Sequence, residues 1–111
     1  MTYACFDVSI ENNIAHIVMS RPEKRNAMSA AFWAELPEIV RDIDENSKAR
    51  VIVISSTGPV FSAGIDLAMF STDINGPGDK NAPTHGAAFY QTVKRLQSTF
   101  TALEDCRIPV L

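Results

Sequence analysis

The residue types best suited to chemistry form a short run of small side chains in the middle of the chain. Ser62, Ala63 and Gly64 come shortly before an acidic residue, Asp66. Small side chains let a ligand approach the main chain closely. Main-chain N–H groups at such a turn, or at a helix start, can donate to an oxygen that carries negative charge. The oxygen could belong to a phosphate or to a polarised carbonyl, and the run could also be an ordinary strand-to-helix turn.

The flanking residues predict the elements that would hold this run in place. Residues 51–54 are four β-branched apolar residues, which is typical of a strand buried on both faces. Residues 55–59 contain Gly and Pro and end that strand. Asp66 is suited to cap a short helix, with Leu67 on its apolar side. We therefore expect the small residues at the mouth of a short helix.

A hairpin and a helix are predicted before the buried strand. Apolar and polar residues alternate over residues 6–10, and residues 14–19 form a second, more buried strand. Asparagines at 12–13 mark the turn between them. Residues 29–46 show helical spacing of apolar side chains. Pro37 lies inside this helix and is expected to kink it or make it restart, because proline lacks an N–H and crowds the preceding turn.

The last third of the chain predicts a loop, a helix and the start of a strand. Residues 71–85 are rich in Gly, Pro, Asp and Asn and are expected to be a flexible loop. Residues 87–104 are expected to be helical, and Val110 to begin a strand. The predicted apolar face of this helix, expected in the core or at a subunit contact, consists of Phe89, Val93, Leu96, Phe100 and Leu103.

Composition excludes several classes of protein. The chain has 111 residues and a net charge of −3, which suits one globular domain. It has no basic patch for nucleic acid and no apolar run long enough to span a membrane. Its start has neither a signal-peptide core nor an Arg-rich transit segment. Cys5 and Cys106 lack ligand spacing, so we expect free thiols and no metal site.

Three stretches, in the same order, resemble the crotonase family, also called the enoyl-CoA hydratase/isomerase superfamily. Residues 60–67 resemble the family phrase F-(S/A/C)-A-G-x-D-(L/I), which follows a V-I-V-(I/L)-(T/S) strand. Residues 20–28 resemble its R-P-x-x-x-N-A-(M/L) loop. Residues 106–111 resemble the strand lead-in C-x-(K/R)-P-(V/T)-(I/L). Residues 61–67 and 97–111 are most similar to the dienoyl-CoA isomerase branch.

The resemblance implies an α/β fold, the crotonase-like (ClpP/crotonase) spiral of ββα units. Residues 1–111 would be the N-terminal portion of a single domain truncated to its first turns, with the C-terminal part absent. The implied function is an acyl-CoA isomerase of fatty-acid β-oxidation, which shifts the double bonds of a dienoyl-CoA through an oxyanion-stabilised enolate. The alternatives are an enoyl-CoA hydratase and a non-catalytic acyl-CoA-binding fragment.

The resemblance also implies the residues of the site. The main-chain N–H of Ala63 would donate to the thioester oxygen, and an internal hydrogen bond at this N–H would contradict the acyl-CoA assignment. Lys24, Arg25 and Ala27 would lie near the CoA nucleotide, where a cation suits a phosphate. The segment implied to bind the substrate consists of Ser62, Ala63, Gly64, Ile65, Asp66 and Leu67.

The remaining catalytic groups are implied to lie beyond Leu111. These are a second oxyanion donor and the acids that move the protons, so the chain alone is expected to be inactive. We interpret Asp66 as a helix cap, since a carboxylate beside the developing enolate would repel it.

The resemblance also bears on cofactors, partners and location. CoA would enter as part of the substrate thioester, with no permanently bound cofactor. The intact protein would be a homo-oligomer, a trimer or hexamer, in mitochondria or peroxisomes.

Overall fold

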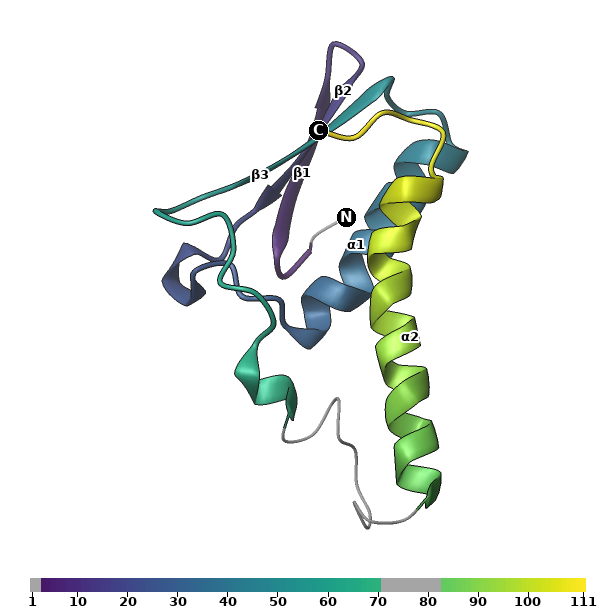
Figure 1. Cartoon of the computed structure of the whole chain (residues 1–111). Coiled ribbons are helices and arrows are strands. Elements are labelled where there is room, and N and C mark those ends of the chain that lie inside the picture. Colours follow the sequence, from purple (N-terminus) through teal and green to yellow (C-terminus); the bar gives the residue numbers. More distant parts are fainter. Residues whose placement is uncertain (1–2, 71–82) are drawn as a thin grey trace.

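The computed structural model describes residues 3–70 and 83–111, and its described part contains three strands and two long helices. Figure 1 shows their arrangement. Two short 3-10 turns, η1 and η2, connect them. The elements in chain order are β1 (Phe6–Glu11), β2 (Ile14–Met19), η1 (Pro22–Lys24), α1 (Ala30–Glu45), β3 (Val51–Ser56), η2 (Leu67–Phe70) and α2 (Pro83–Asp105). No helix in the described residues is long and apolar enough to cross a membrane.

The three strands form one sheet in the order β1-β2-β3. β1 and β2 are antiparallel and make the predicted hairpin. Asn12 and Asn13 both have left-handed backbones, with φ of 53° and 66°, which asparagine tolerates better than most residues in a tight turn. β3 pairs in parallel with β2 after the chain has crossed over through α1. The positions of the three strands are therefore confirmed. The expected burial of residues 51–54 on both faces is not, since Ile52 is buried and the other residues of β3 are half-buried.

The core lies between one face of this sheet and one face of α1. Ser29 caps the helix, because its side-chain oxygen accepts from the N–H of Phe32. His16 is on the opposite face of β2 and is exposed. The buried side chains that α1 contributes are Phe32, Leu36, Ile39, Val40 and Ile43. The sheet contributes Phe6, Ala15, Ile17, Met19 and Ile52.

α1 continues through Pro37 as one helix, so a restart at this residue is wrong. Proline has no N–H to donate to the carbonyl oxygen four residues earlier, which belongs to Trp33. In the structure, Oγ1 of Thr99 in α2 donates to that oxygen at 3.1 Å. The second helix thus satisfies the acceptor that the proline leaves without a helical partner.

α2 begins at Pro83, four residues before the predicted start at Ala87. The predicted loop at 71–85 therefore ends before Pro83, and its residues 71–82 lie outside the described part of the chain. α2 packs beside α1, where the rings of Trp33 and Phe100 meet edge to face with centroids 5.1 Å apart. The N-terminal half of α2 extends past the N-terminal end of α1 (Figure 1).

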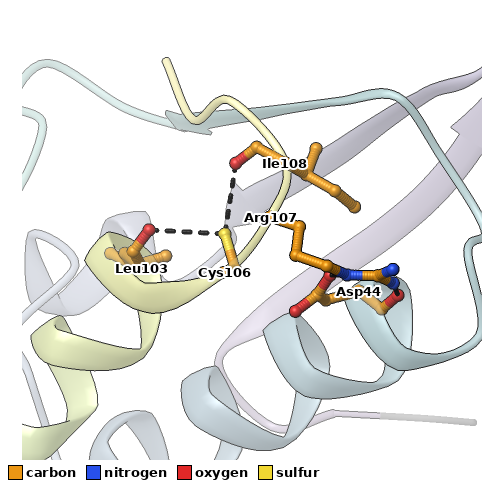
Figure 2. Close-up of polar contacts among 5 residues, drawn as sticks. All are labelled: Asp44, Leu103, Cys106, Arg107 and Ile108. Atoms are coloured by element: carbon orange, nitrogen blue, oxygen red, sulfur yellow. Dashed lines mark hydrogen bonds and ion pairs between the residues drawn. The ribbon is translucent and has the colours of Figure 1, made fainter.

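Polar contacts hold the end of α2 against the end of α1 (Figure 2). Nε of Arg107 lies 2.8 Å from Oδ1 of Asp44, and Nη2 of Arg107 donates to the carbonyl oxygen of Asp44. Beyond this point Val110 forms a parallel bridge with Ile52 of β3. The prediction that Val110 begins a strand is confirmed, and the bridge lies on the edge of β3 opposite β2.

Candidate functional site

Two loops that are distant in sequence lie side by side and form the candidate site. The first loop, residues 21–28, follows β2, and the second loop, residues 57–66, follows β3. They approach closely: a Cβ added to Gly58 would lie 2.9 Å from Cβ of Pro22. Gly58 also has a left-handed backbone, with φ of 85°. The structure thus brings together the two motifs that the sequence analysis placed near CoA and near the acyl group.

The N–H of Ala63 donates to the carbonyl oxygen of Arg25 at 2.9 Å. The prediction that this N–H is the oxyanion donor is therefore wrong, because its single hydrogen already has an internal partner. This is the internal hydrogen bond expected to contradict the acyl-CoA assignment, so that assignment cannot rest on Ala63 and needs a different donor. The residues on either side are held as well. Oγ of Ser62 donates to the carbonyl oxygen of Asn26 at 2.8 Å, and the N–H of Gly64 donates to the same Oγ at 3.1 Å.

The neighbouring N–H of Ile65 has no hydrogen-bond partner among residues 3–70 and 83–111. The reason is the parallel bridge that joins Met28 to Ile65. The N–H of Met28 donates to the carbonyl of Gly64 at 2.8 Å, and the N–H of Asp66 donates to the carbonyl of Met28 at 3.0 Å. In such a ladder the residue between the two bonds turns its own N–H away from the partner strand.

The residue before Ile65 is a glycine with open space beside it. Gly64 has a left-handed backbone, with φ of 89°, and apart from its chain neighbours no heavy atom of residues 3–70 and 83–111 lies within 4 Å of a Cβ added there. A group bound on this side could therefore approach the main chain closely. The site can thus offer a main-chain donor to an oxygen, as the small residues predicted, but from Ile65 and not from Ala63.

The helix predicted after the small residues is a 3-10 turn of four residues, η2. Asp66 caps it as expected, since its Oδ1 accepts from the N–H of Ala68 at 3.0 Å. Leu67 is 78% exposed, so its predicted place on an apolar side is wrong, whereas Met69 in the same turn is buried. One turn sums few peptide dipoles, so the site depends on individual N–H groups more than on a helix dipole.

Lys24 and Arg25 are exposed where the first loop approaches the second. Arg25 and Asn26 are consecutive left-handed residues, with φ of 53° and 54°. The two cations could contact phosphate groups of a nucleotide. Ala27 follows them and is half-buried. Within the described residues no group of three or more His, Cys, Asp or Glu side chains could hold a metal ion.

Asn26 is the residue of the site to which the sequence analysis assigned no role. It is 2% exposed, and its side chain joins the two loops. Its Oδ1 accepts from the N–H of Arg21 at 2.9 Å. Its Nδ2 donates to the carbonyls of Thr57 at 2.7 Å and Val60 at 3.4 Å. Its signal in the sequence is its place as the fixed Asn of the R-P-x-x-x-N-A-(M/L) loop. Asparagine also tolerates a left-handed backbone and can bond to nearby main chain.

An apolar cleft of about 350 Å³ lies beside the site. Met28 of the first loop and Phe61 of the second loop contribute to it, and the ring of Phe61 is 58% exposed. Such a lining suits an apolar group. The other residues of the cleft are Phe6, Met19, Phe32, Leu36, Ile54, Phe100, Leu103, Val110 and Leu111.

Comparison with known proteins gives consistent results. A family profile described as "Enoyl-CoA hydratase/isomerase" matches residues 9–111. The mitochondrial Delta(3,5)-Delta(2,4)-dienoyl-CoA isomerase of Rattus norvegicus is 42% identical over 106 residues, which cover 93% of this chain and 32% of that protein. The peroxisomal enzyme of the same name from Arabidopsis thaliana is 31% identical over 104 residues, which cover 91% of this chain and 37% of that protein.

Solved structures show the same relationship. An enoyl-CoA hydratase from Mycobacterium smegmatis has a TM-score of 0.79 at 27% identity, covering 98% of this chain and 39% of that one. A protein from Thermobifida fusca YX, solved in complex with CoA, has a TM-score of 0.73 at 34% identity, covering 96% and 40%. The chain thus spans about a third of the length of the two curated relatives, 32% and 37%.

Proposed function

Because this chain belongs to the enoyl-CoA hydratase/isomerase family and has the N-terminal part of the crotonase fold, we propose that it acts on a fatty acyl-CoA thioester. The specific reaction that we propose is isomerisation of a dienoyl-CoA, in which a proton leaves and returns through an enolate. One observation carries the proposal: within residues 3–70 and 83–111 the N–H of Ile65 has no hydrogen-bond partner, and its loop is bonded to the one that presents Lys24 and Arg25.

In this proposal the N–H of Ile65 donates to the oxygen of the thioester carbonyl. Negative charge grows on this oxygen as the enolate forms, so the hydrogen bond strengthens in the transition state. Loss of one such donor typically costs about 10²–10³ in rate. The open space beside Gly64 admits the thioester, and Asp66 stays occupied as a cap. We assign no proton-transfer group among the described residues, and we expect no turnover from this chain by itself.

Lys24 and Arg25 would hold the phosphate groups of CoA, close to Ala27. A charge-assisted hydrogen bond contributes about 1.5–3 kcal/mol, and about 1.4 kcal/mol is tenfold in affinity. Replacing both cations by Gln should therefore weaken CoA binding about tenfold or more, measured by titration calorimetry at fixed salt. The control is Arg41→Gln, an exposed cation on α1, which should leave the affinity unchanged. Equal losses in both variants would contradict a phosphate site on the first loop.

The experiment that tests the function compares binding with turnover. CoA and butyryl-CoA, at 100 times their dissociation constants, should each stabilise the chain by about 2.7 kcal/mol. Turnover is then assayed with a 3,5-dienoyl-CoA, by the absorbance of the conjugated 2,4-diene. No stabilisation by either ligand would contradict the acyl-CoA assignment. Stabilisation without turnover of any enoyl- or dienoyl-CoA, in this chain and in longer chains that contain it, would favour a non-catalytic acyl-CoA-binding module.

The second candidate reaction is hydration of a trans-2-enoyl-CoA. It is supported by the similarity to the Mycobacterium smegmatis enoyl-CoA hydratase. Both reactions need the same polarised carbonyl, so the N–H of Ile65 serves either. They differ in the product: hydration removes the enoyl double bond, whereas isomerisation keeps both double bonds of the diene. The identity of 42% to a dienoyl-CoA isomerase supports our choice of isomerisation as the first candidate.

We also propose the surroundings in which the protein works. CoA arrives as part of the substrate, and no cofactor is permanently bound. The intact protein forms a homo-oligomer, a trimer or hexamer, which sedimentation equilibrium would test. The similar isomerases of rat and Arabidopsis thaliana are named as mitochondrial and peroxisomal, so one of these two compartments is proposed. Imaging of a tagged protein in its own cells would test this location.

A further inference from the structure

Asn26 is buried between the two loops without reaching open space. Among the described side chains it is, with Thr99, one of two buried polar residues. Its carboxamide makes three hydrogen bonds: Oδ1 accepts one from the first loop, and Nδ2 donates two to the second loop. A buried amide that lost these partners would pay the desolvation cost of each group, so the arrangement holds the loops in one register.

The main chain next to Asn26 holds the second loop in the same way. The carbonyl oxygen of Asn26 accepts a hydrogen bond from Oγ of Ser62. The same Oγ accepts a hydrogen bond from the N–H of Gly64. The carbonyl oxygen of Arg25 accepts from the N–H of Ala63. Ser62 and Ala63 are therefore bonded directly to Asn26 and Arg25, and the N–H of Gly64 is held through Ser62. The next N–H along the chain, that of Ile65, has no partner in the part of the chain that the structure describes.

We propose that Asn26 is a positioning residue that aims the N–H of Ile65 at the thioester oxygen without touching the substrate itself. The inference rests on the proposed function. The side chain of Asn26 also holds the first loop, which presents Lys24 and Arg25. It therefore links the oxyanion donor to the proposed phosphate contacts. Asparagine suits this place for two reasons: it accepts a left-handed backbone, with φ of 54°, and it both donates and accepts.

The first arm of the test uses the ligand-free chain. Asn26→Gly removes the carboxamide but keeps a residue that tolerates the left-handed backbone. Asn13→Gly is the matched control, the same change at an exposed left-handed Asn in the β1–β2 turn. Amide hydrogen exchange followed by NMR should show the N–H of Ala63 and Asp66 losing protection in Asn26→Gly only. The amides of β1, β2 and β3 should keep theirs.

The second arm adds butyryl-CoA labelled with ¹³C at the thioester carbonyl. A donor at the carbonyl oxygen should move this resonance downfield on binding, and should slow exchange at the N–H of Ile65, while CoA alone does neither. Asn26→Gly should lose most of the downfield shift, and Asn13→Gly should keep it. A purely structural residue far from the site would change the stability and leave the carbonyl shift of the bound ligand intact.

The outcomes separate the two proposals. If the unchanged chain binds butyryl-CoA and Asn26→Gly keeps the full carbonyl shift, the positioning role is wrong while the proposed function stands. If the unchanged chain does not bind butyryl-CoA, the proposed function fails. If, in addition, the N–H of Ala63 keeps its protection from exchange in Asn26→Gly, then Asn26 does not hold the two loops in register either. If Asn26→Gly does not fold, Ser62→Ala decides: it removes the hydroxyl between Asn26 and Gly64 and should reduce the same carbonyl shift.

Discussion

Helices α1 and α2 lie side by side, yet different interactions hold each of them. α1 has five buried apolar residues on one face, packed against the sheet. α2 is longer, with 23 residues, but the one fully buried side chain among those described in it is the polar Thr99. Two aromatic residues of α2, Phe89 and Tyr90, are 39% and 60% exposed. Apolar burial thus fixes α1, whereas a few specific contacts fix α2.

The difference shows that helical spacing predicts a helix better than it predicts which face is buried. The predicted apolar face of α2 includes Phe89 and Phe100, which are 39% and 45% exposed. Part of the predicted face does meet α1, because the ring of Phe100 contacts Trp33, but the buried residue at this contact is the neighbouring Thr99. Thr99 donates to the carbonyl of Trp33, which Pro37 leaves without a helical donor. A polar group that the spacing of apolar residues does not reveal thus takes part in this contact.

The largest expected effect is a cavity in the face of α1. Ile39→Ala should lower the free energy of unfolding by about 2–5 kcal/mol, because Ile39 is 1% exposed and the space left cannot fill. Leu96→Ala in α2 should cost less, since Leu96 is only half-buried. Urea unfolding followed by far-UV circular dichroism measures both variants. Equal losses would show that α2 is held by apolar burial as much as α1 is.

A smaller effect is expected at the contact between the two helices. Thr99→Val keeps the shape of the side chain but leaves the carbonyl of Trp33 without its donor, which should cost about 1–3 kcal/mol. Pro37→Ala supplies a main-chain N–H to the same carbonyl. The cost of Thr99→Val should therefore shrink when Pro37→Ala is present, and a double-mutant cycle in urea measures this coupling. If the two changes are additive, Thr99 and Pro37 are independent.

Most of the fold follows from local patterns in the sequence. The hairpin, α1, β3 and the start of a strand at Val110 were predicted because alternation, caps and turn residues act over a few neighbouring residues. Family membership and the crotonase fold followed from three motifs in order. The start of α2 was placed four residues late because Gly, Pro and Thr at its first turn weaken the helical pattern.

The sequence predicts the segment that forms the site but not which main-chain N–H of that segment is available. The run of small residues gives no indication of which N–H is used internally, because that depends on a partner loop about 35 residues earlier in the chain. The carbonyl of Arg25 takes the N–H of Ala63, and the bridge to Met28 turns the N–H of Ile65 outward. The burial of Asn26 is likewise a property of two loops together. Long-range pairing decides each of these points.

The smallest expected effect lies at the C-terminal end of α1, where polar contacts add to the apolar face. Nζ of Lys48 lies 2.6 Å from Oδ2 of Asp42, and Nδ2 of Asn46 donates to Oδ1 of Asp42 at 2.6 Å. These two hydrogen bonds lower the pKa of the Asp42 carboxyl below its ordinary value, and the bond from Lys48 has the larger effect. A lowered pKa in the folded state means that the contribution to stability is complete above the unfolded-state pKa.

The contribution of Asp42 should therefore disappear as the pH falls through its lowered pKa, and should be constant near neutral pH. Both groups of the ion pair face solvent, so the effect on global unfolding should be close to the limit of detection. NMR titration of the Asp42 carboxyl measures the pKa directly, and Lys48→Gln should raise it toward the ordinary value. A large loss of stability at neutral pH in Lys48→Gln would mean that polar contacts hold α1 as well, and would remove the contrast with α2.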